Sequence, residues 1–126
     1  MEIPKWIKPF FVVAGLYDGI LGLLFLAMPY KLFSLTNVPP PNHVGYIQFP
    51  ALLLVIFGVM FLNIARNPIV NRDLIFYGIL LKMSYSGVVL SHWLLGNMPI
   101  MWIAFAFFDL VFLALFVVAR QAIGQQ

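Results

Sequence analysis

Apolar residues fall into four long runs that are separated by short polar or turn-forming stretches. The four runs cover residues 8–28, 43–64, 72–95 and 98–119. Each run is about as long as the roughly 20 residues that an α-helix needs to cross a hydrocarbon core about 30 Å thick. The pattern predicts an all-α fold, an antiparallel four-helix transmembrane bundle, in which residues 1–126 form a single domain.

Composition indicates that the membrane is the solvent of this chain. Hydrophobic residues make up 63% of the sequence and charged residues only 9%, whereas soluble domains carry about 25% charged residues. A chain with so few charges cannot cover itself with a surface that faces water. No cluster of Lys and Arg is present to neutralise phosphates, so the sequence argues against nucleic-acid binding.

The basic residues of the loops and termini are distributed unequally between the two sides of the predicted membrane. One side holds Lys5, Lys8, Arg66, Arg72 and Arg120, and the other holds Lys31. Because cytoplasmic loops carry an excess of Lys and Arg, this asymmetry predicts that both termini are cytoplasmic.

Three of the four runs contain an ionisable residue near the centre: Asp18, Lys82 and Asp109. Each lies ten residues from the end of its run that faces the predicted cytoplasm, and a rise of 1.5 Å per residue puts it about 15 Å deep. An isolated charge at the bilayer centre costs roughly 3 kcal/mol on insertion scales. We therefore expect the three side chains to meet and pair.

Such a cluster carries one net negative charge when all three groups are ionised, because one ammonium neutralises one carboxylate. The two carboxylates then favour a shared proton, which makes the cluster able to hold one. Two interpretations stay open. In the first, the cluster is a structural element that fixes helix order and register. In the second, it binds the polar group of a ligand or moves a proton.

Small residues give the first run a face on which another helix can approach closely. Gly15 and Gly19 have GxxxG spacing, and Gly22 continues the face. Asp18 lies beside these glycines, so we expect it to point into the bundle. The glycine face favours association with further copies or subunits, or it serves only packing within the chain.

Polar residues also extend from Lys82 toward the predicted outer surface. Tyr85 and Ser86 follow Lys82 at i+3 and i+4, hence on the same helix face. Further polar residues stand at the same outer level: His43, Tyr46, Gln48 and His92. These positions predict a polar track from the outer surface to the charges. The alternative is a set of interhelical hydrogen bonds and interfacial side chains.

If the track is a cavity, an aromatic lining suits a flat apolar molecule with a polar head, such as a quinone, an isoprenoid or a lipid. The candidates for this lining are Phe11, Phe25, Phe105, Phe112 and Trp93. A haem or chlorin ligated by His43 or His92 is a further candidate cofactor. No H-E-x-x-H motif, nucleophile elbow or cysteine is present, and no metal site is predicted.

Three segments carry a resemblance to a known group: Pro40 to Tyr46, Asn71-Arg72, and Tyr77 to Lys82. With the first run, they resemble small bacterial four-helix membrane proteins of the DoxX-like group. The resemblance implies a bacterial inner membrane. Members of the group are linked to quinone-coupled oxidoreductase complexes, so it also implies an accessory subunit or a quinone nearby.

Together these features favour a small membrane protein that binds a lipid-like or quinone-like molecule, or an accessory subunit of a larger membrane complex. One alternative is an intramembrane isomerase or oxidoreductase, with an Asp and Lys82 as acid and base on a lipidic substrate. Another is a proton-coupled transporter, although four short helices leave little material for alternating access. The expected partners are membrane lipid and further copies or subunits.

Overall fold

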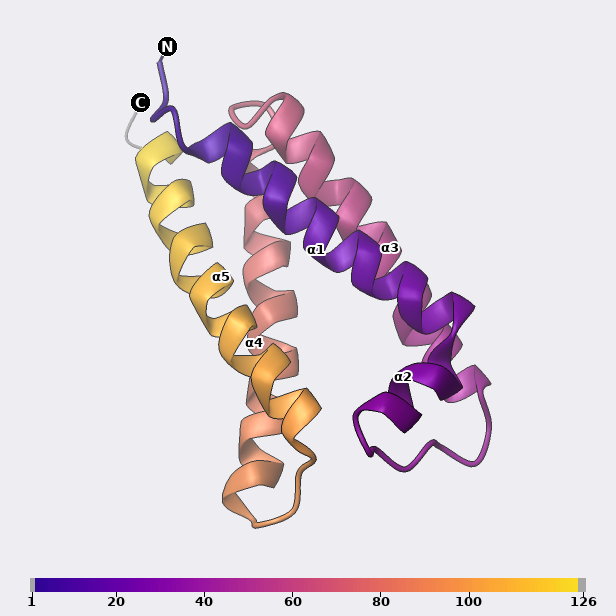
Figure 1. Cartoon of the computed structure of the whole chain (residues 1–126). Coiled ribbons are helices and arrows are strands. Elements are labelled where there is room, and N and C mark those ends of the chain that lie inside the picture. Colours follow the sequence, from indigo (N-terminus) through magenta and orange to yellow (C-terminus); the bar gives the residue numbers. More distant parts are fainter. Residues whose placement is uncertain (1, 125–126) are drawn as a thin grey trace.

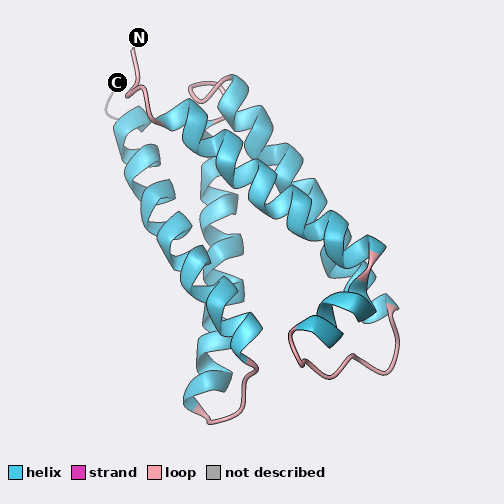
Figure 2. Cartoon of the chain, viewed as in Figure 1, coloured by secondary structure: helices cyan, strands magenta, loops and turns pink. Residues whose placement is uncertain are grey.

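The structure is a computed structural model that describes residues 2–124, and within them it contains α-helices and no strand. The helices are α1 (Ile7–Ala27), α2 (Pro29–Leu35), α3 (Gly45–Arg66), α4 (Arg72–Leu94) and α5 (Ile100–Gly124) (Figure 1). By length and composition, α1, α3, α4 and α5 can each cross a membrane. The prediction of an all-α bundle is confirmed, and loops join its helices, the longest of them between α2 and α3 (Figure 2).

Two helix boundaries differ from the pattern of apolar runs. Helix α3 begins at Gly45, whose N–H donates to Nδ1 of His43 at 2.9 Å, so His43 precedes the helix. Helix α5 continues to Gly124 and includes Arg120, whereas the apolar run ends at residue 119. The backbone oxygen of Arg120 accepts a hydrogen bond from Nε of Arg72 at 3.1 Å, and this contact ties the end of α5 to the start of α4.

The short helix α2 lies in the first loop and packs back onto the bundle. Pro29 is its first residue, where a missing N–H is harmless. Phe33 is buried, and its ring lies 5.9 Å from that of Phe25 on α1 and 6.1 Å from that of Trp102 on α5. Through Phe33, α2 therefore contacts both α1 and α5.

Helices α1 and α3 approach each other through glycines. A Cβ atom added to Gly58 would lie 2.8 Å from the carbonyl oxygen of Gly15 and 2.8 Å from the nitrogen of Gly19. A Cβ atom on Gly22 would meet the carbonyl oxygen of Ala51 in the same way. The small-residue face of the first run therefore packs against α3 of the same chain, where backbone meets backbone.

The four long helices form two pairs, α1 with α3 and α4 with α5. The pairs lie together at the end that holds the termini and diverge toward the end that holds α2 (Figure 1). An aromatic core joins them at the closed end, where the ring of Phe116 lies 5.3 Å from that of Phe11 and 5.0 Å from that of Phe61. The polar side chains of the bundle interior lie next to this core, where the helix pairs begin to diverge (Figure 1).

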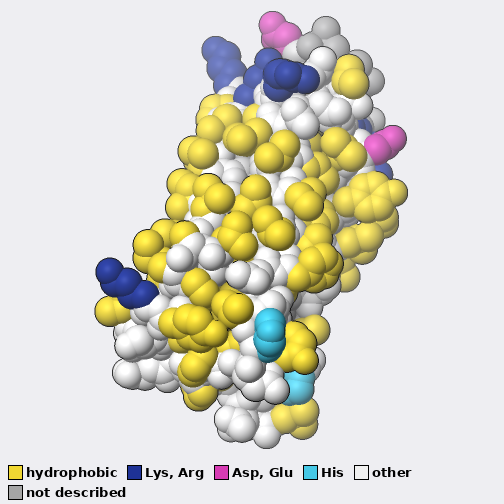
Figure 3. Space-filling view, turned by 90° about the vertical axis from the view of Figure 1, so that its right-hand side faces the viewer, with side chains coloured by type: hydrophobic (Ala, Val, Ile, Leu, Met, Phe, Trp, Pro, Cys, Tyr) yellow, Lys and Arg dark blue, Asp and Glu magenta, His cyan; other side chains and the backbone are white. Residues whose placement is uncertain are grey.

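The outer surface matches a membrane setting. Figure 3 shows hydrophobic side chains over most of one face, with basic side chains gathered at the end that holds the termini. Large apolar side chains such as Ile20, Ile56 and Val111 are more than half exposed, as expected for helices whose outer faces contact lipid rather than water.

Candidate functional site: a buried charge cluster beside an apolar cavity

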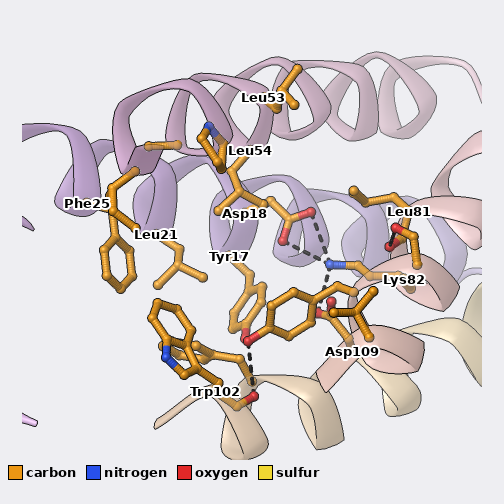
Figure 4. A pocket seen from close by; sticks show the side chains of 17 residues that line it. Tyr17, Asp18, Leu21, Phe25, Leu53, Leu54, Leu81, Lys82, Trp102 and Asp109 are labelled. Carbon is orange, nitrogen blue, oxygen red and sulfur yellow. Dashed lines mark hydrogen bonds and ion pairs between the residues drawn. The ribbon is translucent and has the colours of Figure 1, made fainter. Parts of the chain in front are cut away.

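The three charges near the centres of the membrane-spanning helices meet inside the bundle. Nζ of Lys82 on α4 donates to Oδ1 and Oδ2 of Asp18 on α1 at 2.9 and 3.1 Å. It also donates to Oδ1 of Asp109 on α5 at 3.1 Å (Figure 4). The side chains of Asp18 and Lys82 are 1% exposed and that of Asp109 is 10% exposed. The expected meeting of Asp18, Lys82 and Asp109, here called the charge cluster, is thus confirmed.

Local sequence explains how each charge comes to face inward. Asp18 lies between Gly15 and Gly22, which face α3, so the close packing of α1 on α3 also turns Asp18 inward. Lys82 follows Gly78 by one helical turn, and a Cβ atom on Gly78 would lie 2.6 Å from the ring of Phe61. The absent side chain at Gly78 lets this ring pack beside Lys82.

Aromatic rings surround the ammonium group of Lys82. Its Nζ lies 5.1 Å from the ring centroid of Phe112, 5.4 Å from that of Tyr17 and 5.8 Å from that of Phe61. Ring faces attract a cation electrostatically, and more strongly where water is excluded. The rings and the two carboxylates therefore stabilise the ammonium together.

A cavity of about 420 Å³ adjoins the charge cluster. Its volume lies within the range of about 300–1,000 Å³ that is typical of small-molecule sites. Apolar side chains form most of its wall, and Asp18, Lys82 and Asp109 lie at one end of it (Figure 4). The lining residues are Tyr17, Asp18, Leu21, Phe25, Ile47, Pro50, Ala51, Leu53, Leu54, Leu81, Lys82, Ser84, Tyr85, Val88, Trp102, Phe105 and Asp109.

Exposed residues on two helices line the cavity. Leu53 on α3 and both Ser84 and Val88 on α4 line it and are exposed. All three belong to helices that can cross a membrane, so we expect the cavity to be reachable from the lipid between α3 and α4.

The two residues that follow Lys82 on its helix face have different surroundings. Tyr85 lines the cavity, and its hydroxyl donates to the backbone oxygen of Trp102 at 3.0 Å. Ser86 is buried away from the cavity and donates to the backbone oxygen of Ala106 at 3.3 Å. Ser86 thus links α4 to α5, whereas Tyr85 belongs to the cavity wall.

Tyr17 and Trp102 line the cavity although the sequence pattern did not assign them to it. The hydroxyl of Tyr17 is buried and has no hydrogen-bond partner within residues 2–124. One signal was present in the sequence: Tyr17 is a polar residue in the middle of an apolar run and directly precedes Asp18. For Trp102 there was no such signal, because an aromatic residue near a helix end is common at a membrane interface.

The two tyrosines provide a matched test of this geometry. We expect Tyr85→Phe to lower the free energy of unfolding by about 0.6 kcal/mol, the average for a hydrogen bond between membrane helices. Tyr17→Phe removes a buried unpaired hydroxyl and should leave stability unchanged or raise it by about 1–3 kcal/mol. Thermal unfolding in one detergent compares the two variants. A stability loss in Tyr17→Phe would show that its hydroxyl has a partner in the membrane.

The structure does not bring the outer polar residues to the cavity. His43, Tyr46, Gln48 and His92 are all exposed, and none of them lines it. His43 is held at the start of α3 by its bond to the N–H of Gly45. Because the helix pairs diverge toward this end (Figure 1), residues at a similar depth on α3 and α4 do not converge there. The continuous polar track predicted from their depth is therefore not present.

The expected aromatic lining is found only in part. Phe25 and Phe105 line the cavity. Phe11 and Phe112 instead belong to the aromatic core at the closed end, and Trp93 is exposed, with its ring 6.0 Å from that of Phe107. Among the described residues, no three His, Asp or Glu side chains gather as a metal site would need.

No family model, no curated protein and no solved structure matches this chain.

Proposed function

We propose that this protein binds a lipid-like or quinone-like molecule in the cavity, with the polar head of that molecule against the charge cluster. One observation carries the proposal: an apolar cavity of ligand size ends at a carboxylate, Asp109, that remains partly accessible. A cluster with a purely structural role would be expected to close on itself on all sides. Here the side chains of Asp18 and Lys82 are 1% exposed, whereas that of Asp109 is 10% exposed.

The exposed residues of the cavity wall indicate where the ligand comes from. Leu53, Ser84 and Val88 line the cavity and are exposed. A molecule already dissolved in the bilayer can enter there without crossing water. The apolar wall then accepts its body, and the charge cluster accepts its head, which is the usual division of labour in ligand pockets.

The setting of the protein is part of the same proposal. The basic side chains at the end that holds the termini (Figure 3) support an orientation with both termini in the cytoplasm. The resemblance to the DoxX-like group favours a bacterial inner membrane and the role of an accessory subunit beside a quinone-coupled complex. A bound quinone or lipid would then be shared with, or passed to, that larger complex.

Native mass spectrometry of the gently extracted protein tests the proposal, with a matched pair of variants on α3. Leu54 lines the cavity, so Leu54→Trp fills part of it. Ile56 is 61% exposed and does not line the cavity, so Ile56→Trp adds the same side chain on the lipid-facing surface. We expect the wild type and Ile56→Trp to retain a lipid-like mass that Leu54→Trp loses.

Equal retention by the three proteins would contradict the proposal, because the retained molecule would then not depend on the cavity. A wild type that carries no lipid-like mass, even after reconstitution with membrane extract, would contradict it as well. Thermal unfolding of both variants checks that Leu54→Trp is folded.

A further inference from the structure

The hydrogen-bonding capacity of the charge cluster restricts the head group that the cavity accepts. An ammonium group has three N–H donors and no acceptor. In this structure Nζ of Lys82 has three acceptors within 3.1 Å, namely both carboxylate oxygens of Asp18 and one of Asp109. The two oxygens of one carboxylate lie too close together to take separate N–H groups, so Asp18 shares one N–H of Lys82 and Asp109 takes a second. The rings of Tyr17, Phe61 and Phe112 lie around the rest of the ammonium group.

When all three groups are ionised, the free position of the cluster is an acceptor. Oδ1 of Asp109 bonds to Lys82, whereas no hydrogen bond reaches its Oδ2 from any described side chain or backbone group. Asp109 is also the more exposed of the two carboxylates, at 10% against 1% for Asp18. A ligand head at the end of the cavity thus meets a carboxylate oxygen.

The net charge of the cluster also disfavours some head groups. With one ammonium and two carboxylates, the cluster carries one net negative charge when all three groups are ionised. Like charges repel strongly where water is excluded, so a phosphate or carboxylate head is disfavoured. A head that only accepts hydrogen bonds, such as an ether, leaves Oδ2 of Asp109 without a partner.

We infer that the cavity selects a single-chain amphiphile whose head is a neutral hydrogen-bond donor, a hydroxyl group, which donates to Asp109. An ammonium head also donates, and it would offset the negative charge of the cluster, but it must first leave the bilayer surface as a full charge, which costs roughly 3 kcal/mol on insertion scales. The inference rests on the proposed function and narrows its ligand to an alcohol, which excludes an oxidised quinone because the carbonyl oxygens of its head only accept hydrogen bonds.

The size and shape of the cavity favour one chain. Its volume of about 420 Å³ is near the lower end of the range for sites that enclose a whole small ligand. The charge cluster lies at one end, and Phe25 and Trp102 lie at the other (Figure 4). A bound alcohol would therefore place its hydroxyl at Asp109 and its chain against Trp102.

Quenching of tryptophan fluorescence by brominated chains reports this binding directly. Trp6 and Trp93 do not line the cavity, so the double variant Trp6→Phe/Trp93→Phe leaves Trp102 as the only reporter. The double variant Trp6→Phe/Trp102→Phe leaves Trp93, which is 45% exposed and reports partition into the surrounding lipid. Both are reconstituted in phosphatidylcholine vesicles and titrated with four probes that share one brominated chain: an alcohol, its methyl ether, an amine and a phosphate.

We expect the alcohol to quench Trp102 at concentrations that leave Trp93 unaffected. The methyl ether, the amine and the phosphate should each need about tenfold more or higher, which is the ratio for losing one hydrogen bond to a charged group. If the methyl ether, the amine or the phosphate quenches Trp102 at the same concentration as the alcohol, the inference about the head group is wrong. If no probe quenches Trp102 more than Trp93, the proposed function itself fails.

Asp109→Asn in the Trp102-only protein assigns the selectivity to one atom. In this variant Lys82 still donates to the side-chain oxygen at position 109, so the amide NH₂ must take the place of Oδ2. The ligand then meets a donor instead of an acceptor. We expect the tenfold preference for the alcohol over the ether to fall to about twofold or less. Asp73→Asn, on the exposed first turn of α4, should keep it. A preference for the alcohol that persists in Asp109→Asn would overturn the assignment to Asp109. If this variant does not fold, the titrations of the Trp102-only protein with native Asp109 still test the head group.

Discussion

Lys82→Met is expected to destabilise the bundle by about 3–5 kcal/mol, the cost of removing one partner from a buried ion pair. The substitution keeps a long apolar side chain but leaves Asp18 and Asp109 without their shared cation. Asp18 is 1% exposed, so water cannot solvate the carboxylate that remains. Thermal unfolding in detergent, followed by far-ultraviolet circular dichroism, measures the loss. A melting temperature equal to that of the wild type would show that the charge cluster does not support the fold.

The variant that removes all three charges provides the control. Asp18→Asn/Lys82→Met/Asp109→Asn keeps the shape of the side chains and leaves no unpaired charge inside the bundle, and replacing a whole buried ion pair is often neutral. We expect it to be clearly more stable than Lys82→Met alone. If it is folded but no longer retains the ligand, the charges serve binding. If it retains the ligand fully, their role is structural.

Depth along a helix was predictable from the sequence, and rotation about the helix was predictable only in part. The rise per residue is fixed, so Asp18, Lys82 and Asp109 were expected at one level, and they meet there. The glycines beside Asp18 also fixed which face of α1 turns inward. At Tyr17 no comparable signal fixed the direction of the side chain, and its place in the cavity wall emerged only from the structure.

The cavity itself depends on the angle between the helix pairs, which the apolar pattern does not contain. The pattern treats four helices as one parallel bundle, whereas the pairs diverge toward α2 (Figure 1). His43 and His92 were therefore expected at the outer end of the polar track, whereas His43 lies exposed before α3 and His92 lies exposed in the last turn of α4. Helix α5 extends beyond its apolar run to Gly124, and Arg72 of α4 donates to the backbone oxygen of Arg120 in this extension. The apolar pattern contains no information about such a contact between two helix ends.

Gly58→Leu is expected to destabilise the protein by about 3 kcal/mol, in the upper part of the usual range for overpacking. Its Cβ atom would lie 2.8 Å from the carbonyl oxygen of Gly15 and 2.8 Å from the nitrogen of Gly19. Both are backbone atoms, which cannot rotate away as a side chain can. Helix α1 must then move off α3, and because Asp18 lies on the same helix, the charge cluster is disturbed as well.

Gly87→Leu is the matched control, because it makes the same substitution in a helix of similar length. No atom lies within 4 Å of a Cβ atom added at Gly87, and the residue is exposed. Leucine is a better helix former than glycine, so stability should stay unchanged or rise by up to about 1 kcal/mol. Thermal unfolding of the two variants in the same detergent gives the comparison. Equal melting temperatures would mean that α1 and α3 do not pack through their glycines, and that Asp18 owes its inward position to its ion pair alone.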